Sequence, residues 1–202
     1  MKYIDIVNKI EGWCSVDKMT KLYNLIVYTK PDIVVEIGVF AGKSLIPQAL
    51  ALKDNKHGTI IGIDAWDKNE SIKNVHDKNN IKWWSEINHE DIYNKCVKYI
   101  NDNNLQSHVK LIKSTSKDCI SEIPDNIDIL HIDGNHEEMN SCMDVELYVP
   151  KIRKGGYLWF DDAKWSQTQK AVKLIEDKYK LTLINKADSD DPNNCCNLYI
   201  KL

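Results

Sequence analysis

Three aspartates stand at two places where the sequence predicts that neighbouring strands end. Asp133 follows the apolar run IDILHI, and the pair Asp161 and Asp162 follows the run YLWF. Ligands of open α/β sheets bind outside the carboxyl ends of the strands, so we expect these carboxylates to face one crevice. Hard oxygen ligands of this kind suit Mg²⁺, which commonly keeps several waters and leaves room for a substrate hydroxyl. The same carboxylates could instead cap helices or stay solvated in loops, and the sequence leaves that alternative open.

A glycine turn forms a second candidate ligand site. In VVEIGVFAGKS an apolar run enters Gly38, and Gly42 precedes a helical pattern, so backbone can approach a ligand at a helix N-terminus. The P-loop requires a spacing of four residues before its Gly-Lys pair, whereas three residues separate Gly38 from Gly42. Phe40 takes the place of the second glycine of the dinucleotide fingerprint, where the pyrophosphate would press on the backbone. Both nucleotide-phosphate interpretations are therefore disfavoured.

The remaining pattern, E-x-G-x-x-x-G, resembles motif I of the class I S-adenosylmethionine-dependent methyltransferases. In that class the glycine loop packs against the methionine part of the cofactor. Asp64 ends the run TIIGID, where an acid can accept both ribose hydroxyls of an adenosine. Ser114, Thr115 and Ser116 follow the next strand, where the class contacts adenine, although Ser116 could equally be a helix N-cap. The resemblance implies a cofactor site formed by Glu36, Gly38, Gly42, Lys43, Ser44, Asp64, Ala65, Trp66, Ser114, Thr115, Ser116 and Asp133.

A longer stretch, from about residue 32 to residue 165, resembles the family-24 methyltransferases. This group is related to macrocin O-methyltransferase and cephalosporin hydroxylase and is often found beside glycosyltransferases. The matching motifs are IDAWD, IDILHIDGNH, the D-x-E of Asp144 and Glu146, the L-x-x-P-K-x-x-x-G-G run, and FDD. The resemblance implies that Asp133, Asp161 and Asp162 bind a divalent cation and that His136, with Asp133, is catalytic. Asn135 departs from the family, since many relatives carry Asp there.

The elements that must position these residues alternate along the chain. Short β-branched runs predict strands at 33–37, 59–63, 109–112, 127–132, 157–160, 181–184 and 196–200. Helical spacing predicts helices at 19–27, 44–52, 90–100, 138–148 and 167–179. Such alternation indicates a doubly wound α/β fold, with a mostly parallel, Rossmann-like sheet of seven strands. The turn-rich NKADSDDPNN between the last two strands predicts an antiparallel hairpin at the C-terminal edge.

One segment interrupts this alternation. Residues 66–89 are polar and contain Trp83 and Trp84, and we interpret them as a substrate loop or lid. Trp66, Trp83, Trp84 and Trp165 could line a platform for a sugar, or they could be core residues.

His131 lies within an apolar strand and is interpreted as a core histidine. Residues 1–30 are a helical lead-in, and residues 1–202 form a single domain.

The bulk properties restrict the partners. A net charge of −3 with scattered lysines gives no field for a phosphate backbone, so we expect no nucleic-acid partner. No apolar stretch reaches the ~20 residues of a membrane span, and the start lacks the apolar core of a secretory signal. We therefore expect a cytoplasmic protein without a membrane partner, which could form a homo-oligomer.

Together these features predict an S-adenosylmethionine-dependent O-methyltransferase, assisted by Mg²⁺ or another divalent cation, that acts on a sugar, nucleotide-sugar or glycan hydroxyl. A cation stabilises an alkoxide, and a nearby imidazole can remove the hydroxyl proton. Two alternatives stay open: a metal-independent small-molecule methyltransferase, and a binding module that keeps the cofactor fold without catalysis.

Overall fold

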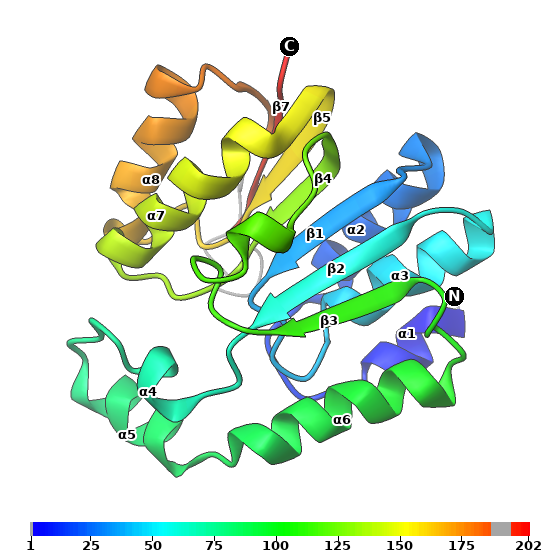
Figure 1. Cartoon of the computed structure of the whole chain (residues 1–202), viewed down its shortest axis with the longest axis horizontal. Coiled ribbons are helices and arrows are strands. Elements are labelled where there is room, and N and C mark those ends of the chain that lie inside the picture. Colours follow the sequence, from blue (N-terminus) through cyan, green and yellow to red (C-terminus); the bar gives the residue numbers. More distant parts are fainter. Residues whose placement is uncertain (1, 187–194) are drawn as a thin grey trace.

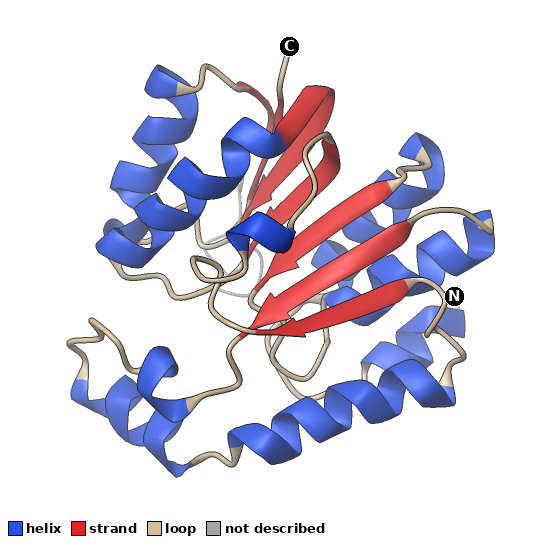
Figure 2. Cartoon of the chain, in the orientation of Figure 1, coloured by secondary structure: helices blue, strands red, loops and turns tan. Residues whose placement is uncertain are grey.

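The computed structural model describes residues 2–186 and 195–202. A single sheet of seven strands lies at the centre, with helices on both of its faces (Figures 1 and 2). The strands are β1 (Ile33–Ile37), β2 (Thr59–Asp64), β3 (Val109–Lys113), β4 (Ile127–Ile132), β5 (Ile152–Phe160), β6 (Thr182–Asn185) and β7 (Asn197–Ile200). The α-helices are α1 (Lys2–Val7), α2 (Val16–Thr29), α3 (Leu45–Asn55), α4 (Lys68–Ser71), α5 (Lys78–Glu86), α6 (His89–Asp102), α7 (Glu138–Tyr148) and α8 (Gln169–Lys173).

The strand order is β3-β2-β1-β4-β5-β7-β6. The first five strands of this order pair in parallel, whereas β7 pairs antiparallel with both β5 and β6. This arrangement confirms the doubly wound fold and the antiparallel C-terminal pair. Parallel neighbours need crossovers through helices, whereas β6 and β7 have no helix between them among the residues that the structure describes. The predicted turn between them covers residues 185–194, of which 187–194 lie outside the described residues.

Two apolar clusters cover the two faces of the sheet. Adjacent residues of a strand point to opposite faces, so Val34 packs with one cluster and Val35 with the other. The first cluster draws on α1, α2, α3 and α6, and the second on α7 and α8 (Figure 1). Loops follow the carboxyl ends of β1, β2, β4 and β5, and these loops carry residues of the candidate site.

The N-terminal lead-in belongs to this packing. Ser15 caps α2 by accepting a hydrogen bond from the backbone of Lys18, and Lys30 ends the helix in a left-handed conformation just before Pro31. The buried residues of α2 are Lys18, Met19, Leu22 and Ile26. A lysine therefore stands on the face of α2 that packs against the domain.

The structure differs from the sequence expectation in two places. The segment 66–89 is not a loop throughout, because it contains α4 and α5, each capped by an aspartate: Asp67 for α4 and Asp77 for α5. The single helix expected at 167–179 is three consecutive pieces: a 3-10 turn at Ser166–Thr168, α8, and a π-helical turn at Leu174–Lys178. No helix of the described residues is both long and apolar enough to cross a membrane.

Candidate active site

The glycine loop lies at the carboxyl end of β1, directly against the end of β4. The Gly38 amide donates to the carbonyl of Ile63 (2.9 Å), and the Asp133 amide donates to the carbonyl of Ile37 (2.8 Å). Gly38 has a φ of +87°, and a Cβ placed on it would lie 2.0 Å from the Asp133 carbonyl oxygen. Only glycine fits this position, because any side chain would collide with backbone. The loop after β1 and the loop after β4 are thus built as one unit.

The Asp64 side chain orders the glycine loop. Its Oδ2 accepts hydrogen bonds from the amides of Val39 (3.0 Å) and Phe40 (2.9 Å), and its Oδ1 accepts one from Trp66 (2.8 Å). Burial raises the pKa of Asp64, and these three donors oppose that rise. A carboxylate offers about four acceptor positions, so one stays available to a ligand hydroxyl. The predicted ribose contact stays a prediction.

Several other residues of the predicted cofactor site serve to fix the loop in this structure. Glu36 is completely buried, and it accepts hydrogen bonds from Ser44 Oγ (2.6 Å) and from the Gln48 amide. Lys43 Nζ donates to the carbonyl of Gly12 (3.0 Å) and ties the lead-in to the loop. The structure therefore turns the Glu36 and Ser44 side chains inward. Cofactor contacts by Glu36, Gly42, Lys43, Ser44 and Ala65 stay predictions.

Trp66 is 4% exposed, and its indole Nε1 donates to the carbonyl of Phe40 (2.9 Å). Its ring packs edge-on against Tyr93, with the centroids 4.9 Å apart. The backbone of Trp66 has a φ of +43°, which is uncommon for a bulky residue. Trp66 therefore braces the glycine loop from inside, which is the core role that the sequence left open.

The segment after β3 lies beside Asp64, because the Ser114 amide donates to the Asp64 carbonyl (3.0 Å). The N-cap considered for Ser116 was wrong: Thr115 Oγ1 accepts the amide of Asp118 (3.1 Å), and Ser116 Oγ donates to Asp144 of α7. Burial raises the pKa of Asp144 to about 7, although the Ser116 hydroxyl opposes that shift. Adenine contacts by residues 114–116 stay predictions.

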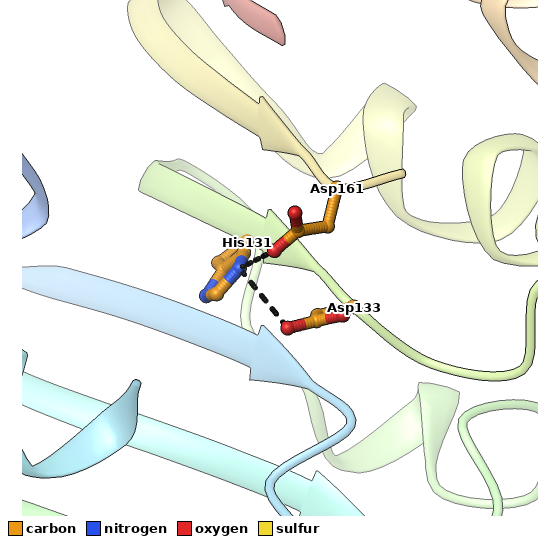
Figure 3. Close-up of side chains that lie close together, drawn as sticks. All are labelled: His131, Asp133 and Asp161. Atoms are coloured by element: carbon orange, nitrogen blue, oxygen red, sulfur yellow. Dashed lines mark hydrogen bonds and ion pairs between the residues drawn. The ribbon is translucent and has the colours of Figure 1, made fainter. Parts of the chain in front are cut away.

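The carboxylate centre lies beyond the glycine loop, at the ends of β4 and β5. Figure 3 shows His131, Asp133 and Asp161 turned toward one another. His131 Nε2 lies 3.3 Å from Asp161 Oδ2 and 3.9 Å from Asp133 Oδ2, and its Nδ1 lies 3.5 Å from Glu36 Oε2. Burial disfavours the imidazolium, yet the neighbouring carboxylates raise the pKa of His131 to about 9. His131 is therefore a buried histidine with partners, as the sequence predicted, and it adjoins the site.

Lys18 completes this group from the opposite end of the chain. Its Nζ lies 3.1 Å from Asp133 Oδ2 and forms a closer ion pair with Asp161 Oδ2. The lysine is 2% exposed. Burial alone would raise the pKa of Asp161, but Lys18 and His131 hold that pKa well below its usual range. Burial and the neighbouring charge of Asp161 raise the pKa of Asp133 to about 7.

Asp162 lies close to Asp133 and pairs with His136. His136 Nε2 lies 2.9 Å from Asp162 Oδ2, and the imidazole packs edge-on against Trp165 with 5.0 Å between the ring centroids. Burial disfavours the imidazolium, but the hydrogen bond and charge of Asp162 raise the pKa of His136 above its ordinary value. The structure thus brings His136 into the centre with the predicted aspartates.

These side chains form two overlapping groups of possible metal ligands rather than one. The first contains His131, Asp133 and Asp161, and the second contains Asp133, His136 and Asp162; within each group the ligand atoms lie within 4.8 Å of one another. The Lys18 ammonium already stands in the first group. The second group offers two hard carboxylates and an imidazole, a donor set that fits a divalent cation. Metal binding by Asp133, Asp161 and Asp162 stays a prediction.

Sequence reasoning missed Lys18 as a site residue. The signal was available, because Lys18, Leu22 and Ile26 recur every four residues and so lie on one helical face. A lysine on an otherwise apolar stripe needs a buried partner of opposite charge. The stripe does not tell which carboxylate that partner is.

An aromatic cluster lies above the glycine loop. Trp13, Phe40, Trp83 and Trp84 have ring centroids between 4.8 and 6.3 Å apart. Trp13 is 55% exposed and Trp83 is 38% exposed. The lead-in and α5 therefore meet over Phe40 and leave aromatic surface open to solvent. The sequence had not connected Trp13 with the segment 66–89.

A family model described as a methyltransferase domain matches residues 35–163. An uncharacterised protein of Acanthamoeba polyphaga mimivirus is 33% identical over 156 residues, which cover 73% of this chain. The chain spans 61% of that relative's length.

Two solved structures have the same fold. A methyltransferase from Geobacter sulfurreducens has a TM-score of 0.63 at 18% identity, with 94% of this chain and 80% of that chain covered. The O-methyltransferase TomG from Streptomyces achromogenes, solved in complex with S-adenosylmethionine, has a TM-score of 0.65 at 13% identity, with 93% and 80% covered. Because the family model covers more than half of the sequence, the chain belongs to the family-24 methyltransferases, a branch of the class I S-adenosylmethionine-dependent methyltransferases.

Proposed function

We propose that the chain transfers a methyl group from S-adenosylmethionine to a hydroxyl of a sugar, nucleotide sugar or glycan. One observation carries this proposal: Gly38 of the cofactor loop packs directly on the backbone of Asp133, whose side chain belongs to the carboxylate centre. A donor held by the glycine loop would thus have its reactive end next to the groups that handle the acceptor. Methyl transfer needs this adjacency, because the protein mainly positions the two reactants.

His136 is our candidate for the base. Its Nε2 lies at hydrogen-bonding distance from Asp162, which favours the neutral tautomer with the proton on Nε2 and leaves Nδ1 as the basic atom. Nδ1 would accept the proton of the acceptor hydroxyl while the oxygen attacks the methyl carbon. When bound, S-adenosylmethionine supplies that carbon on a sulfonium centre, so the products are a methyl ether and S-adenosylhomocysteine. Asp133, which belongs to both groups of possible metal ligands, would orient the acceptor hydroxyl.

A divalent cation such as Mg²⁺ would be held by Asp133 and Asp162. Asp161 faces Lys18, and this contact favours Asp162 over Asp161 as the second oxygen ligand. The chemistry that such a cation supplies is stabilisation of negative charge on the acceptor oxygen. Metal-independent transfer is the second candidate, because Lys18 already places one positive charge in the centre.

The aromatic cluster supports a sugar as acceptor. Trp13 and Trp83 expose aromatic surface near the cofactor loop, and such faces suit the C–H surface of a sugar ring. TomG, an O-methyltransferase of the same fold, agrees with a hydroxyl acceptor. The resemblance to a family that is often found beside glycosyltransferases favours a sugar.

Transfer of a labelled methyl group tests the proposal. The purified chain is incubated with labelled S-adenosylmethionine, with and without Mg²⁺, and with a panel of nucleotide sugars and oligosaccharides. We expect label in at least one sugar, and a loss of about 100-fold in kcat for His136→Gln. His57→Gln is the matched control, because His57 is an exposed histidine that pairs with Asp32, outside both groups of the carboxylate centre, and its loss should leave the rate unchanged. Label transfer to phenols or amines but to no sugar would contradict the acceptor class.

A further inference from the structure

The helix that carries Lys18 inserts a positive charge into the carboxylate centre. The side-chain hydroxyl of Ser15 fixes the first turn of α2, and Leu22 and Ile26 anchor the same face in the domain. Lys18 is therefore held by the packing of its helix as well as by its charge. Its Nζ reaches residues that are 115 and 143 positions later in the chain.

The ammonium contacts the Oδ2 atom of both Asp133 and Asp161. These are also the oxygen atoms that lie nearest to His131 Nε2. A divalent cation bound between the same oxygens would stand beside the ammonium at low dielectric, where like charges repel strongly. Lys18 and such a cation are therefore alternatives at this place.

The charges of the surrounding groups agree with this view. Glu36 and Asp161 are fully buried carboxylates, and Asp133 is mostly buried. Without Lys18, these three acids would face the imidazole of His131, while His136 is already paired with Asp162. A buried centre with that excess of negative charge is either strongly destabilised or recruits a cation.

We propose that Lys18 is the resident cation of the Asp133–Asp161 pair, and that it confines any divalent cation to the side of Asp133, Asp162 and His136. This inference rests on the proposed function only because it takes the carboxylate centre to be the acceptor site. It makes Lys18 a positioning residue, because the lysine holds Asp133 through its carboxylate. It also assigns Asp161 the role of holding Lys18 instead of binding a metal.

Titration calorimetry with Mn²⁺ alone tests the proposal on the intact chain, with wild type, Asp161→Asn, Lys18→Met, Lys18→Arg and the double variant Lys18→Met with Asp161→Asn. Wild type and Lys18→Arg should bind Mn²⁺ alike, and Asp161→Asn should bind it as wild type does. Lys18→Met should bind Mn²⁺ at least about tenfold more tightly, because a repelling charge is removed. The double variant should lose that gain, because the new site needs the Asp161 carboxylate.

Two outcomes would overturn the proposal. One is a folded Lys18→Met variant that binds Mn²⁺ no more tightly than wild type. The other is a clear loss of Mn²⁺ binding in Asp161→Asn while Lys18 is present, since Asp161 would then be a ligand in the wild-type centre. The Mn²⁺ titration of Asp161→Asn tests the proposal even if Lys18→Met does not fold. Binding of S-adenosylhomocysteine, measured on the same samples, shows separately whether the proposed function fails.

Discussion

The two ends of the site hold their carboxylates in opposite ways. Asp64, on the proposed cofactor side, is satisfied by backbone amides of Val39, Phe40 and Trp66, all within 25 residues of it. Asp161, on the proposed acceptor side, accepts the amide of Asp162 at Oδ1, but its Oδ2 is held by the side chains of Lys18 and His131, the first of them 143 residues away. The cofactor side is thus set by local loop geometry, and the acceptor side by tertiary assembly. Substitutions on the two sides should therefore reduce stability or binding for different reasons.

The largest effect is expected for Lys18→Met. The change leaves two buried carboxylates without their cation, and breaking a buried ion pair on one side costs about 4 kcal/mol of unfolding free energy. Urea denaturation at pH 7 measures the cost. Lys21→Met is the control on the same helix, because Lys21 pairs with Asp17 at the surface and its loss should change stability little. If both substitutions lowered the free energy of unfolding equally, Lys18 would contribute no more than an exposed surface lysine, which would contradict its role in the carboxylate centre.

Gly38→Ala tests the local side of the comparison. The added Cβ would overlap the Asp133 carbonyl, and the φ of +87° is strained for alanine, so we expect a loss of about 3 kcal/mol. Gly134→Ala is the matched control. Its Cβ would meet the Asp144 Oδ2 atom at 3.2 Å, and its backbone has no positive φ that would strain alanine. A Gly38→Ala variant as stable as Gly134→Ala would show that the two loops are not built as one unit.

Asp144 gives a smaller effect with a defined pH dependence. Its pKa is about 7 in the folded chain and 3.8 as its ordinary value. The folded state therefore binds more protons between these values, so the free energy of unfolding falls as the pH rises from 3.8 to about 7. Asp144→Asn removes this contribution and should stabilise the chain by about 2 kcal/mol at pH 8, with little change at pH 4.

Denaturation curves of both proteins at several pH values measure the difference. Asp161 should behave in the opposite way, because its folded pKa is lowered and its stabilising contribution is lost as the pH falls. A difference between wild type and Asp144→Asn that does not depend on pH would contradict the assignment of a neutral, buried carboxyl.

The smallest effect concerns the aromatic cluster over the loop. Replacing both Trp83 and Trp84 with alanine should raise KM for a sugar acceptor by about fivefold, because uniform substrate binding is lost, and should leave kcat and S-adenosylmethionine affinity nearly constant. Steady-state kinetics with the sugar from the transfer assay measure this. Loss of stability with unchanged kinetic constants would instead make the two tryptophans anchors of α5.

The fold and the contact between the glycine loop and Asp64 could be predicted because their signals are local. The alternation of runs gave β4 and α7 at their observed bounds, and the spacing from Gly38 to Asp64 predicted which loop and which strand end come together. The polar segment 66–89 predicts a loop because it lacks an apolar stripe that would pack on the core, and α5 accordingly has no buried residue. Its existence rests on the Asp77 cap and on aromatic contacts with Trp13.

On the proposed acceptor side, the sequence predicted the aspartates but not the partners of each one. Strand-end positions predicted that Asp133, Asp161 and Asp162 lie near one another, and the structure places Asp161 and Asp162 each in a group of close side chains with Asp133. That they face one ligand crevice stays a prediction. Which of the two adjacent aspartates meets Lys18 and which meets His136 depends on how the chain turns after Phe160, where Asp162 takes a φ of +50°. No local pattern encodes that turn, and the partner of Lys18 is set by the packing of α2.

Calorimetric titration of S-adenosylhomocysteine into wild type and Asp64→Ala tests the central claim, that the loop ordered by Asp64 is the cofactor site. We expect wild type to bind and Asp64→Ala to bind about 100-fold more weakly, because the glycine loop loses the carboxylate that orders it and a ribose hydroxyl loses a charged acceptor. Asp67→Ala, which removes only the cap of α4, should bind as wild type does. An Asp64→Ala variant that is folded and binds with unchanged affinity, or a wild type that binds NAD tightly in place of S-adenosylhomocysteine, would contradict the account.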